Sequence, residues 1–356
     1  MAEKSLMKGN EALAEAALRA GCKCFFGYPI TPQTEIAAYL SKRMPKVGGV
    51  FLQAESEVAA INMVYGCAGT GIRCMTSSSS PGISLKSEGI SYIAGADLPC
   101  VIIDVMRGGP GLGGIQPSQA DYYQITKGVG HGDYHIIVLA PSTVQEMADC
   151  VTKAFDLADK YRIPAVVLAD GLLGQMMEPV AFDDAEIVMS TAENKPWAAN
   201  GHKNKREHNI INSLYLQAPE LEKTIRDRYE RYAEIEKNET KAVADYCEDA
   251  ELVVVAYGST ARLAKSAVDE ARKQGIKAGV FRPVTLYPFP VNELNAAVKS
   301  AKKLLTVEMS MGQMVDDVKL AINCSRPVEF FGRTGGVIPA PNEILAKIKE
   351  MIGGNE

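Results

Sequence analysis

Residues 10–169 alternate short apolar runs with amphipathic segments, and this alternation constrains the fold more than any other feature. The apolar runs, such as Val101-Ile102-Ile103, are continuous instead of alternating with polar residues. Continuous apolar strands are typical of a parallel sheet that helices cover on both faces. We therefore predict an α/β unit with strands at 23–27, 50–54, 73–77, 100–106, 135–140 and 165–169, and helices at 10–20, 32–43, 57–68, 82–94, 117–127 and 143–160.

A second, smaller α/β unit is predicted from Glu251 to the end of the chain. Its strands are expected at 252–256, 278–282, 303–307 and 328–331. A helix through Leu263 and Ala271, stopped by Gly275, follows the first strand, and further helices are expected at 291–301, 313–322 and 341–352. A polar connector, rich in Lys, Arg and His, precedes it and is predicted to include a charged amphipathic helix over 219–246. The predicted divisions are therefore 1–185, 186–248 and 249–356.

Composition narrows the classes of function. The 356 residues are 47% hydrophobic and carry a net charge of −5, which gives no broad attraction for nucleic acid. No apolar run reaches the ~20 residues of a membrane span. The first 21 residues predict a helix and not a signal peptide. The eight cysteines fall mostly inside predicted elements and show no iron–sulfur spacing, so we expect a cytoplasmic protein whose electron carriers lie on other chains.

The stretch Tyr28-Pro29-Ile30-Thr31-Pro32 joins the first predicted strand to the next helix. Thr31 is predicted to cap that helix and Pro32 to occupy its first position. A strand end that meets a helix N-terminus offers free backbone donors and suits an anionic ligand. The alternative is a well-capped helix without a ligand.

Two charged residues stand at comparable junctions. Glu57 is expected on the first helical turn, better placed than Glu55, where the helix N-terminus alone would stabilise a carboxylate. The functional alternative is a carboxylate on the floor of a cleft that hydrogen-bonds a heterocyclic ring nitrogen. Arg107 ends a strand at the edge where open α/β sheets bind ligands, and its guanidinium can grip a carboxylate. Its alternative is a surface arginine beside a flexible loop.

Two further motifs admit more than one interpretation. Gly109, Gly111 and Gly114 match a dinucleotide-binding fingerprint, but nearby prolines delay the helix, so we predict a mobile loop that covers substrate. The run Ser77–Ser80 either lines a polar ligand site or caps the next helix, and capping is expected for at least two of its serines. His131 and His135 lack a third ligand nearby, so no metal site is predicted there. His202 and His208 lie in the basic connector, where the alternatives are contact with an anion and plain solvent exposure.

Taken together, these segments resemble the alpha subunits of 2-oxoacid:ferredoxin oxidoreductases, and in detail those acting on branched-chain 2-oxo acids such as 2-ketoisovalerate. The likeness covers nearly the whole chain. Its matching stretches are Gly9-Asn10-Glu11-Ala12, Tyr28–Pro32, Glu55–Ala60, Thr76–Gly82, Arg107–Gly111, Gly258-Ser259-Thr260 and Val307–Gln313.

The resemblance implies a thiamine diphosphate pyrimidine-binding domain followed by a transketolase C-terminal-like domain. Glu57 would be the catalytic residue that bonds the aminopyrimidine ring. Thr31 and Arg107 would bind the 2-oxo acid. The remaining cofactor contacts would come from Tyr28, Pro29 and Ser79.

The resemblance also implies partners. A beta subunit would hold the diphosphate and Mg²⁺, which agrees with the lack of a complete Gly-Asp-Gly motif here; Ala169-Asp170-Gly171 is the nearest approach. Gamma and ferredoxin-like delta subunits would carry iron–sulfur clusters, coenzyme A would accept the acyl group, and ferredoxin would accept electrons. The alternatives are the same chemistry on 2-oxoglutarate, pyruvate or an aryl pyruvate, a non-catalytic scaffold subunit, and an NAD-dependent dehydrogenase.

Overall fold

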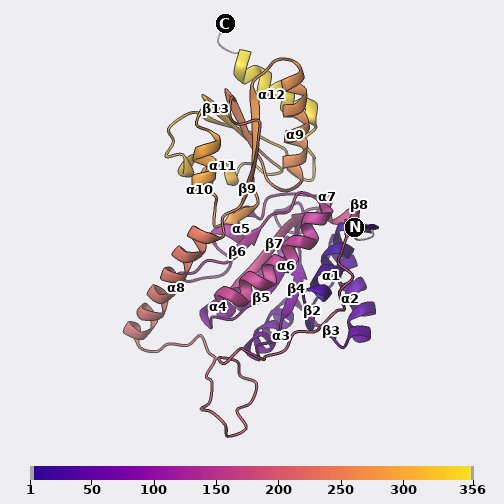
Figure 1. Cartoon of the computed structure of the whole chain (residues 1–356), viewed down its shortest axis with the longest axis vertical. Coiled ribbons are helices and arrows are strands. Elements are labelled where there is room, and N and C mark those ends of the chain that lie inside the picture. Colours follow the sequence, from indigo (N-terminus) through magenta and orange to yellow (C-terminus); the bar gives the residue numbers. More distant parts are fainter. Residues whose placement is uncertain (1–3, 354–356) are drawn as a thin grey trace.

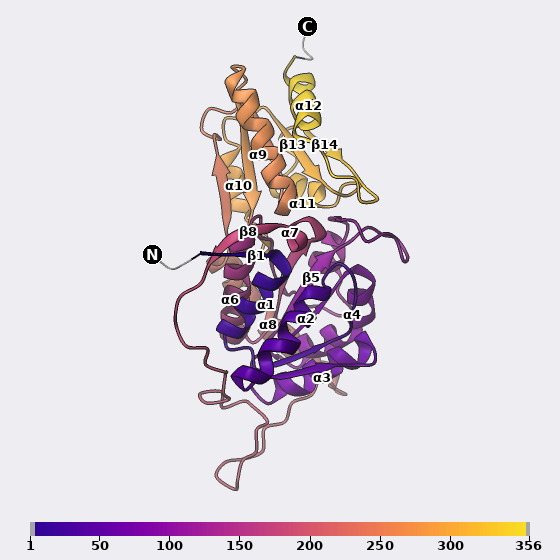
Figure 2. The same ribbon diagram turned by 90° about the vertical axis from the view of Figure 1, so that its right-hand side faces the viewer.

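The computed structural model describes residues 4–353, which form two stacked α/β units (Figures 1 and 2). The first unit is built on a seven-stranded sheet in the order β12-β6-β7-β5-β4-β2-β3, parallel except for β12. Its strands are β2 (Cys24–Gly27), β3 (Val50–Gln53), β4 (Cys74–Ser78), β5 (Cys100–Met106), β6 (Ile137–Leu139), β7 (Pro164–Asp170) and β12 (Thr285–Tyr287).

Helices cover both faces of this sheet, as the continuous apolar strands predict. One face packs against α1 (Gly9–Arg19), α2 (Thr34–Arg43) and α6 (Val144–Tyr161). The other packs against α3 (Glu57–Gly69), α4 (Ser80–Gly95) and α5 (Tyr122–Lys127). Every residue of β5 and β7 is buried, because these two strands lie in the middle of the sheet.

The second unit has a five-stranded sheet in the order β14-β13-β10-β11-β9. Helices α9 and α12 lie on one face of it, and α10 and α11 on the other (Figure 1). Its elements are β9 (Ala242–Asp245), β10 (Leu252–Val255), α9 (Gly258–Lys273), β11 (Ala278–Pro283), α10 (Val291–Ala297), β13 (Lys303–Glu308), α11 (Met314–Ala321), β14 (Val328–Gly332) and α12 (Pro341–Gly353).

The two units interlock. Strand β12, from the second half of the chain, pairs antiparallel with β6 of the first sheet. Buried residues from both units share one hydrophobic cluster, in which the rings of Tyr122 and Tyr257 lie 5.6 Å apart. The side chain of Gln119 donates to the Tyr257 carbonyl and accepts from the Met309 amide, so it bridges the units with buried hydrogen bonds.

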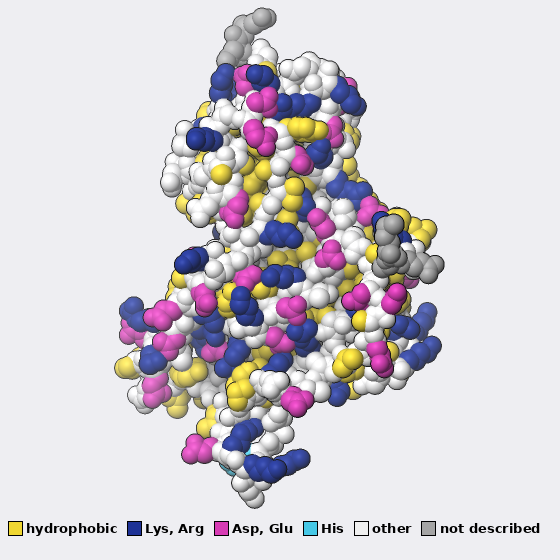
Figure 3. All heavy atoms as spheres, viewed as in Figure 1, with side chains coloured by type: hydrophobic (Ala, Val, Ile, Leu, Met, Phe, Trp, Pro, Cys, Tyr) yellow, Lys and Arg dark blue, Asp and Glu magenta, His cyan; other side chains and the backbone are white. Residues whose placement is uncertain are grey.

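Between the units, the chain runs through a long irregular segment and then α8 (Ala218–Asn238). Helix α8 is anchored by Arg228, which is 5% exposed and donates to both oxygens of Asp97. Charges of both signs are interspersed over its outer face (Figure 3). Within the described residues, no helix combines the length and apolarity that a membrane crossing requires.

The structure corrects several predicted elements. Lys4–Lys8 form strand β1, not part of a helix, and pair antiparallel with β8 (Met177–Ala181). The predicted helix 219–246 ends at Asn238, because residues 242–245 join the second sheet as β9. The helix predicted from residue 117 begins at Tyr122, since Gln119 is drawn into contact with the second unit. The helix predicted from residue 82 begins two residues earlier, at Ser80.

Candidate active site

The turn after β2 does not cap a helix in the predicted way. Helix α2 begins at Thr34, not at Pro32, so the capping role assigned to Thr31 is wrong. The reason is that Gln33 is buried and accepts a hydrogen bond from Ser77 Oγ at 2.6 Å, which holds the turn against β4. The Pro32 carbonyl in turn accepts from Asn10 at 2.8 Å. Thr31 is left exposed at the carboxyl edge of the sheet.

Arg107 and Thr31 are brought together. Arg107 follows β5 directly, as predicted, and its side chain is only 9% exposed. The guanidinium donates to the Thr31 carbonyl at 3.0 Å and to the Leu112 carbonyl at 3.1 Å. Within residues 4–353 its Nε has no hydrogen-bond partner, and no carboxylate makes a direct ion pair with it. The arginine thus retains donor capacity and charge for an anionic ligand.

Glu57 is the first residue of α3 and is 6% exposed. The helix is capped by Ser56, whose hydroxyl accepts from the Ala59 amide, so Glu57 is not needed as the cap. None of the described residues donates a hydrogen bond to its carboxylate, which lies against Gly82 of α4. A Cβ at Gly82 would lie 3.0 Å from Glu57 Oε1 and 2.1 Å from Ser78 Oγ. Only glycine therefore leaves room for this carboxylate.

The serine run does not cap α4 in the expected manner. Ser77 and Ser78 are strand residues of β4, and Ser79 occupies the N-cap position without a side-chain hydrogen bond to the helix. Among the described residues, the buried hydroxyls of Ser78 and Ser79 have no partner. Ser80 instead donates to Asp121 and accepts from the Arg107 amide at 3.1 Å. The first turn of α4 thus lies between Glu57 and Arg107.

Tyr28 and Pro29, which sequence predicts as cofactor contacts, are exposed just beyond the end of β2. Ser79 is buried and faces the inside of the same edge. All six predicted site residues therefore lie at the carboxyl edge of the first sheet, but Tyr28 and Pro29 belong to its outer surface.

A cluster of buried charges lies behind this edge, and sequence reasoning missed it. Burial, reinforced by the Asp121 carboxylate, raises the pKa of Asp104 well above its usual range. Burial also raises the pKa of Asp121 to about 6, although hydrogen bonds from Ser80 and Asp104 oppose the shift. The raised pKa favours the neutral form of Asp104. Lys86, fully buried on α4, has its pKa lowered by burial to about 8.

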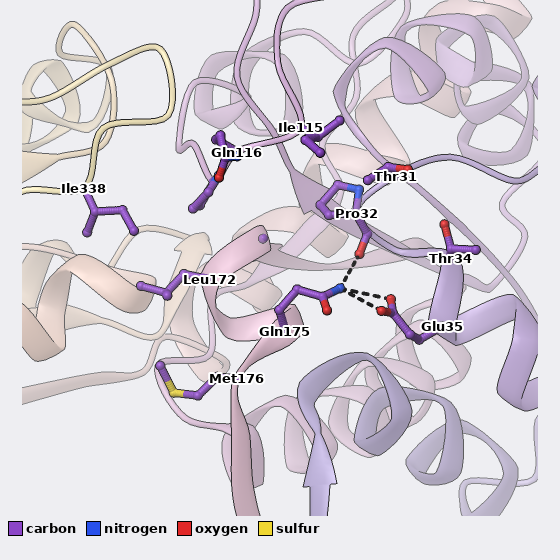
Figure 4. A pocket seen from close by; sticks show the side chains of 12 residues that line it. Thr31, Pro32, Thr34, Glu35, Ile115, Gln116, Leu172, Gln175, Met176 and Ile338 are labelled. Carbon is purple, nitrogen blue, oxygen red and sulfur yellow. Dashed lines mark hydrogen bonds between the residues drawn. The ribbon is translucent and has the colours of Figure 1, made fainter.

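A cavity of about 700 Å³ opens beside Thr31, between the two units (Figure 4). Most of its wall is apolar, and Glu35 is the charged residue in its lining. Although burial opposes it, hydrogen bonds from Asn10 and Gln175 lower the pKa of Glu35, so this carboxylate is ionised at neutral pH. The full lining is Thr31, Pro32, Thr34, Glu35, Ile115, Gln116, Pro117, Gly171, Leu172, Gln175, Met176 and Ile338.

The glycine-rich loop after Arg107 forms one wall of that cavity through Ile115 and Gln116. It closes on itself through an antiparallel bridge between Arg107 and Pro117. Gly113 has a φ of +56°, and a Cβ there would lie 1.8 Å from the Gly108 carbonyl oxygen, so the loop requires glycine at this position. The geometry differs from a dinucleotide-binding turn because no helix begins inside the motif.

Comparison with known proteins shows which family this chain matches. Residues 15–249 match the family described as pyruvate flavodoxin/ferredoxin oxidoreductase, thiamine diphosphate-binding, and residues 250–344 match core domain II of pyruvate:ferredoxin oxidoreductase. A ketoisovalerate oxidoreductase subunit VorB from Methanothermobacter marburgensis is 51% identical over 98% of both chains. A 2-oxoglutarate synthase subunit KorA from Methanocaldococcus jannaschii is 39% identical over 95% of this chain and 97% of its own.

Two solved structures have a fold similar to that of this chain. A 2-oxoglutarate:ferredoxin oxidoreductase from Magnetococcus marinus, solved with 2-oxoglutarate, coenzyme A and succinyl-CoA bound, has a TM-score of 0.85 at 26% identity; the match covers 99% of this chain and 66% of that one. A split-gene transketolase, with a TM-score of 0.60 at 13% identity over 98% and 99% of the chains, shares the fold alone.

The chain therefore belongs to the thiamine diphosphate-binding pyruvate flavodoxin/ferredoxin oxidoreductase family. Within it, the chain is an alpha-type subunit of a 2-oxoacid:ferredoxin oxidoreductase. The predicted resemblance and the predicted fold class are both confirmed.

Proposed function

We propose that this chain supplies the pyrimidine-binding half of a thiamine diphosphate site in an enzyme that oxidatively decarboxylates a branched-chain 2-oxo acid, 2-ketoisovalerate, to the acyl-CoA and CO₂. The relatives named ketoisovalerate oxidoreductase subunit VorB, at 51% and 50% identity, support the substrate assignment. The Glu57 carboxylate is the single observation that carries the assignment of the site, because the residue is only 6% exposed and none of the described residues donates a hydrogen bond to its carboxylate.

The residues around Glu57 fit the cofactor. A carboxylate that the protein leaves unbonded in a mostly buried position can accept a hydrogen bond from a ligand. The space that Gly82 leaves open and the unpartnered hydroxyls of Ser78 and Ser79 provide a polar recess next to it. When bound, thiamine diphosphate supplies the nucleophilic carbon and the electron sink. Glu57 orients the aminopyrimidine ring and holds a shared proton at its ring nitrogen.

Arg107 and Thr31 would grip the carboxylate and carbonyl oxygens of the substrate. The guanidinium is held next to Thr31, which lines the cavity, by its bonds to the Thr31 and Leu112 carbonyls, and a fixed donor costs less to organise on binding. Because the carboxylate leaves as CO₂, this grip must orient it without stabilising the ground state more than the transition state.

The cavity beside Thr31 suits an uncharged alkyl chain. Ile115, Leu172, Met176 and Ile338 supply apolar surface, while the Glu35 carboxylate would repel the second carboxylate of 2-oxoglutarate. This arrangement favours the branched-chain acid over the dicarboxylic alternative.

Partner subunits complete the enzyme in this proposal. A beta subunit would hold the diphosphate and Mg²⁺, and gamma and ferredoxin-like delta subunits would carry electrons from the site to ferredoxin. Apolar side chains are exposed immediately beside the buried site residues, Val58 next to Glu57 and Leu85 next to Lys86, at 47% and 54% exposure. Such a rim is what a subunit that closes over the site would cover.

The test is Glu57→Gln in the complex assembled with its native partners. We expect deuterium exchange at the reactive carbon of bound thiamine diphosphate to slow by about 10²–10⁴-fold, the usual contribution of a positioned acid–base group. Glu55→Gln is the matched control, because Glu55 is exposed two residues away. An unchanged exchange rate in Glu57→Gln would refute the proposed role.

A further inference from the structure

One face of α4 packs against α3 in a regular pattern. Gly82 faces the Glu57 carboxylate, and a Cβ at Gly89 would lie 2.5 Å from Ile61 Cγ2. Lys86 stands four residues after Gly82 and three before Gly89, so the periodicity of the helix places it on the same face. Its side chain therefore enters the layer between α4, α3 and the sheet, behind Glu57.

Lys86 is 0% exposed, which is rare for a lysine. Its ammonium donates to the Ser77 carbonyl at 2.9 Å, and within the described chain no carboxylate forms a direct ion pair with it. A buried charge with one hydrogen bond is expensive, and a methionine of similar size would fill the space at lower cost. Packing alone does not account for a lysine here.

The groups that face this ammonium come from each element around it. They are Glu57 of α3 and Asp104 of β5; further along, Asp121 lies against Asp104 and feels the charge of Arg107. Burial and the neighbouring Asp121 carboxylate raise the pKa of Asp104 well above its usual range. Of the two carboxylates whose charge acts on the Lys86 ammonium, Glu57 has the larger effect and Asp104 the smaller.

We propose that Lys86 is a positioning residue of the cofactor site, whose buried positive charge holds the Glu57 carboxylate in its ionised form toward the cofactor. The inference rests on the proposed role of Glu57. In a medium of low effective dielectric, charges too far apart for an ion pair still interact strongly. Removing the cation makes the carboxylate, and the ring nitrogen that shares its proton, harder to deprotonate.

The experiment uses the assembled complex and compares Lys86→Met, which removes the charge at similar volume, with Lys86→Arg, which keeps it. The first readout is the pH dependence of deuterium exchange at the reactive carbon of thiamine diphosphate. We expect the acid limb to move up by about one pH unit in Lys86→Met and to stay near its original position in Lys86→Arg. Lys42→Met, at an exposed position of α2, is the control and leaves the limb in place.

A second readout does not depend on turnover. Calorimetric titration of the cofactor-free complex with thiamine diphosphate, in buffers of different ionisation enthalpy, gives the number of protons taken up on binding. We expect that number to differ from wild type in Lys86→Met and not in Lys42→Met.

The outcomes separate the two proposals. An acid limb and a proton uptake unchanged in Lys86→Met, with exchange slowed in Glu57→Gln, would overturn the role of Lys86 and leave that of Glu57. Unchanged exchange in Glu57→Gln would remove the basis of both. If Lys86→Met does not assemble while Lys86→Arg assembles and behaves as wild type, the charge serves folding, and the positioning role is also overturned.

Discussion

Two glutamates stand at strand-to-helix junctions of this chain, one in each unit, and their surroundings differ. Glu308, at the end of β13, accepts hydrogen bonds from the amides of Gln313, Met314 and Val315 and from the Ser310 hydroxyl. Glu57, at the start of α3, is nearly as buried and accepts no hydrogen bond from the described residues. Position in the fold does not distinguish a structural glutamate from one that is proposed to bind a ligand. What separates them is whether the protein itself completes the hydrogen bonding of the carboxylate.

The arginines repeat the contrast. Arg228 is paired with Asp97 and anchors α8, whereas Arg107 donates to carbonyls and has no direct ion pair within residues 4–353. At the edge of the first sheet, Glu57 and Arg107 therefore keep hydrogen-bonding capacity that the protein does not use, whereas Glu308 and Arg228 are satisfied internally. Unused capacity of this kind is what a ligand site requires.

The largest effect is expected for Arg107→Ala. The change removes the proposed grip on the substrate carboxylate, and kcat/KM for every 2-oxo acid should fall by about 2–5 kcal/mol in transition-state stabilisation. Steady-state assays with a viologen dye and a panel of 2-oxo acids measure it. In Arg228→Ala the loss should appear in the unfolding temperature instead. A reversed pattern would break the contrast between the two arginines.

The pH dependence of stability sharpens the contrast for Lys86. Its pKa falls on folding from 10.5 to about 8, so between those values the unfolded chain binds more protons than the native chain. Stability therefore rises with pH across this window, by at most about 3 kcal/mol, and the penalty is fully present below pH 8. Lys86→Met should lack this rise. Chemical denaturation of the full chain at pH 7 and pH 10 checks it, and parallel slopes for both proteins would contradict it.

Glu308→Gln tests the other member of the first pair. The substitution replaces an acceptor of several backbone amides, and a loss of about 1–3 kcal/mol in the free energy of unfolding is expected. The assembled fraction should keep wild-type exchange at the cofactor carbon. Slowed exchange in this variant would mean that the two glutamates are not functionally distinct.

The smallest effect is expected for Glu35→Gln. Removing the charge from the cavity lining should raise kcat/KM for 2-oxoglutarate relative to 2-ketoisovalerate by about 1 kcal/mol or less, since the site is open to solvent. The ratio of the two substrates in one assay gives the result. Thr34→Ala, on the same lining but uncharged, is the control.

The sequence predicted most of the parallel elements, because β5 and β7 are continuous apolar runs and α6 is strongly amphipathic. It also placed Thr31, Arg107 and Glu57 at one edge, since the carboxyl ends of parallel strands meet there. Their roles, and those of Tyr28, Pro29 and Ser79, stay predictions, as do the divisions at 185 and 248.

The missed features depend on contacts distant in sequence. Gln33 occupies the cap position of α2 because Ser77 holds its side chain, and no local pattern reports that bond. Asp104 and Lys86 did leave a signal: each interrupts an apolar stripe, one within Val101–Met106 and one between Ile83 and Ile90. A charge in such a place indicates either a satisfied network or a functional group. Strand β12 has three residues and could not be predicted without its partner.

The pairing of β12 with β6 has a consequence for any fragment of this chain. The two family matches meet between residues 249 and 250, so a fragment of the first unit would naturally be designed to end there. A piece ending at that point would lose Thr285–Tyr287 and leave the backbone of β6 uncovered along its outer side. Bare strand edges recruit other chains, so the isolated first unit should precipitate or self-associate where the intact chain does not. The boundary between the two family matches is thus not a boundary between two parts that can be separated without exposing a strand edge.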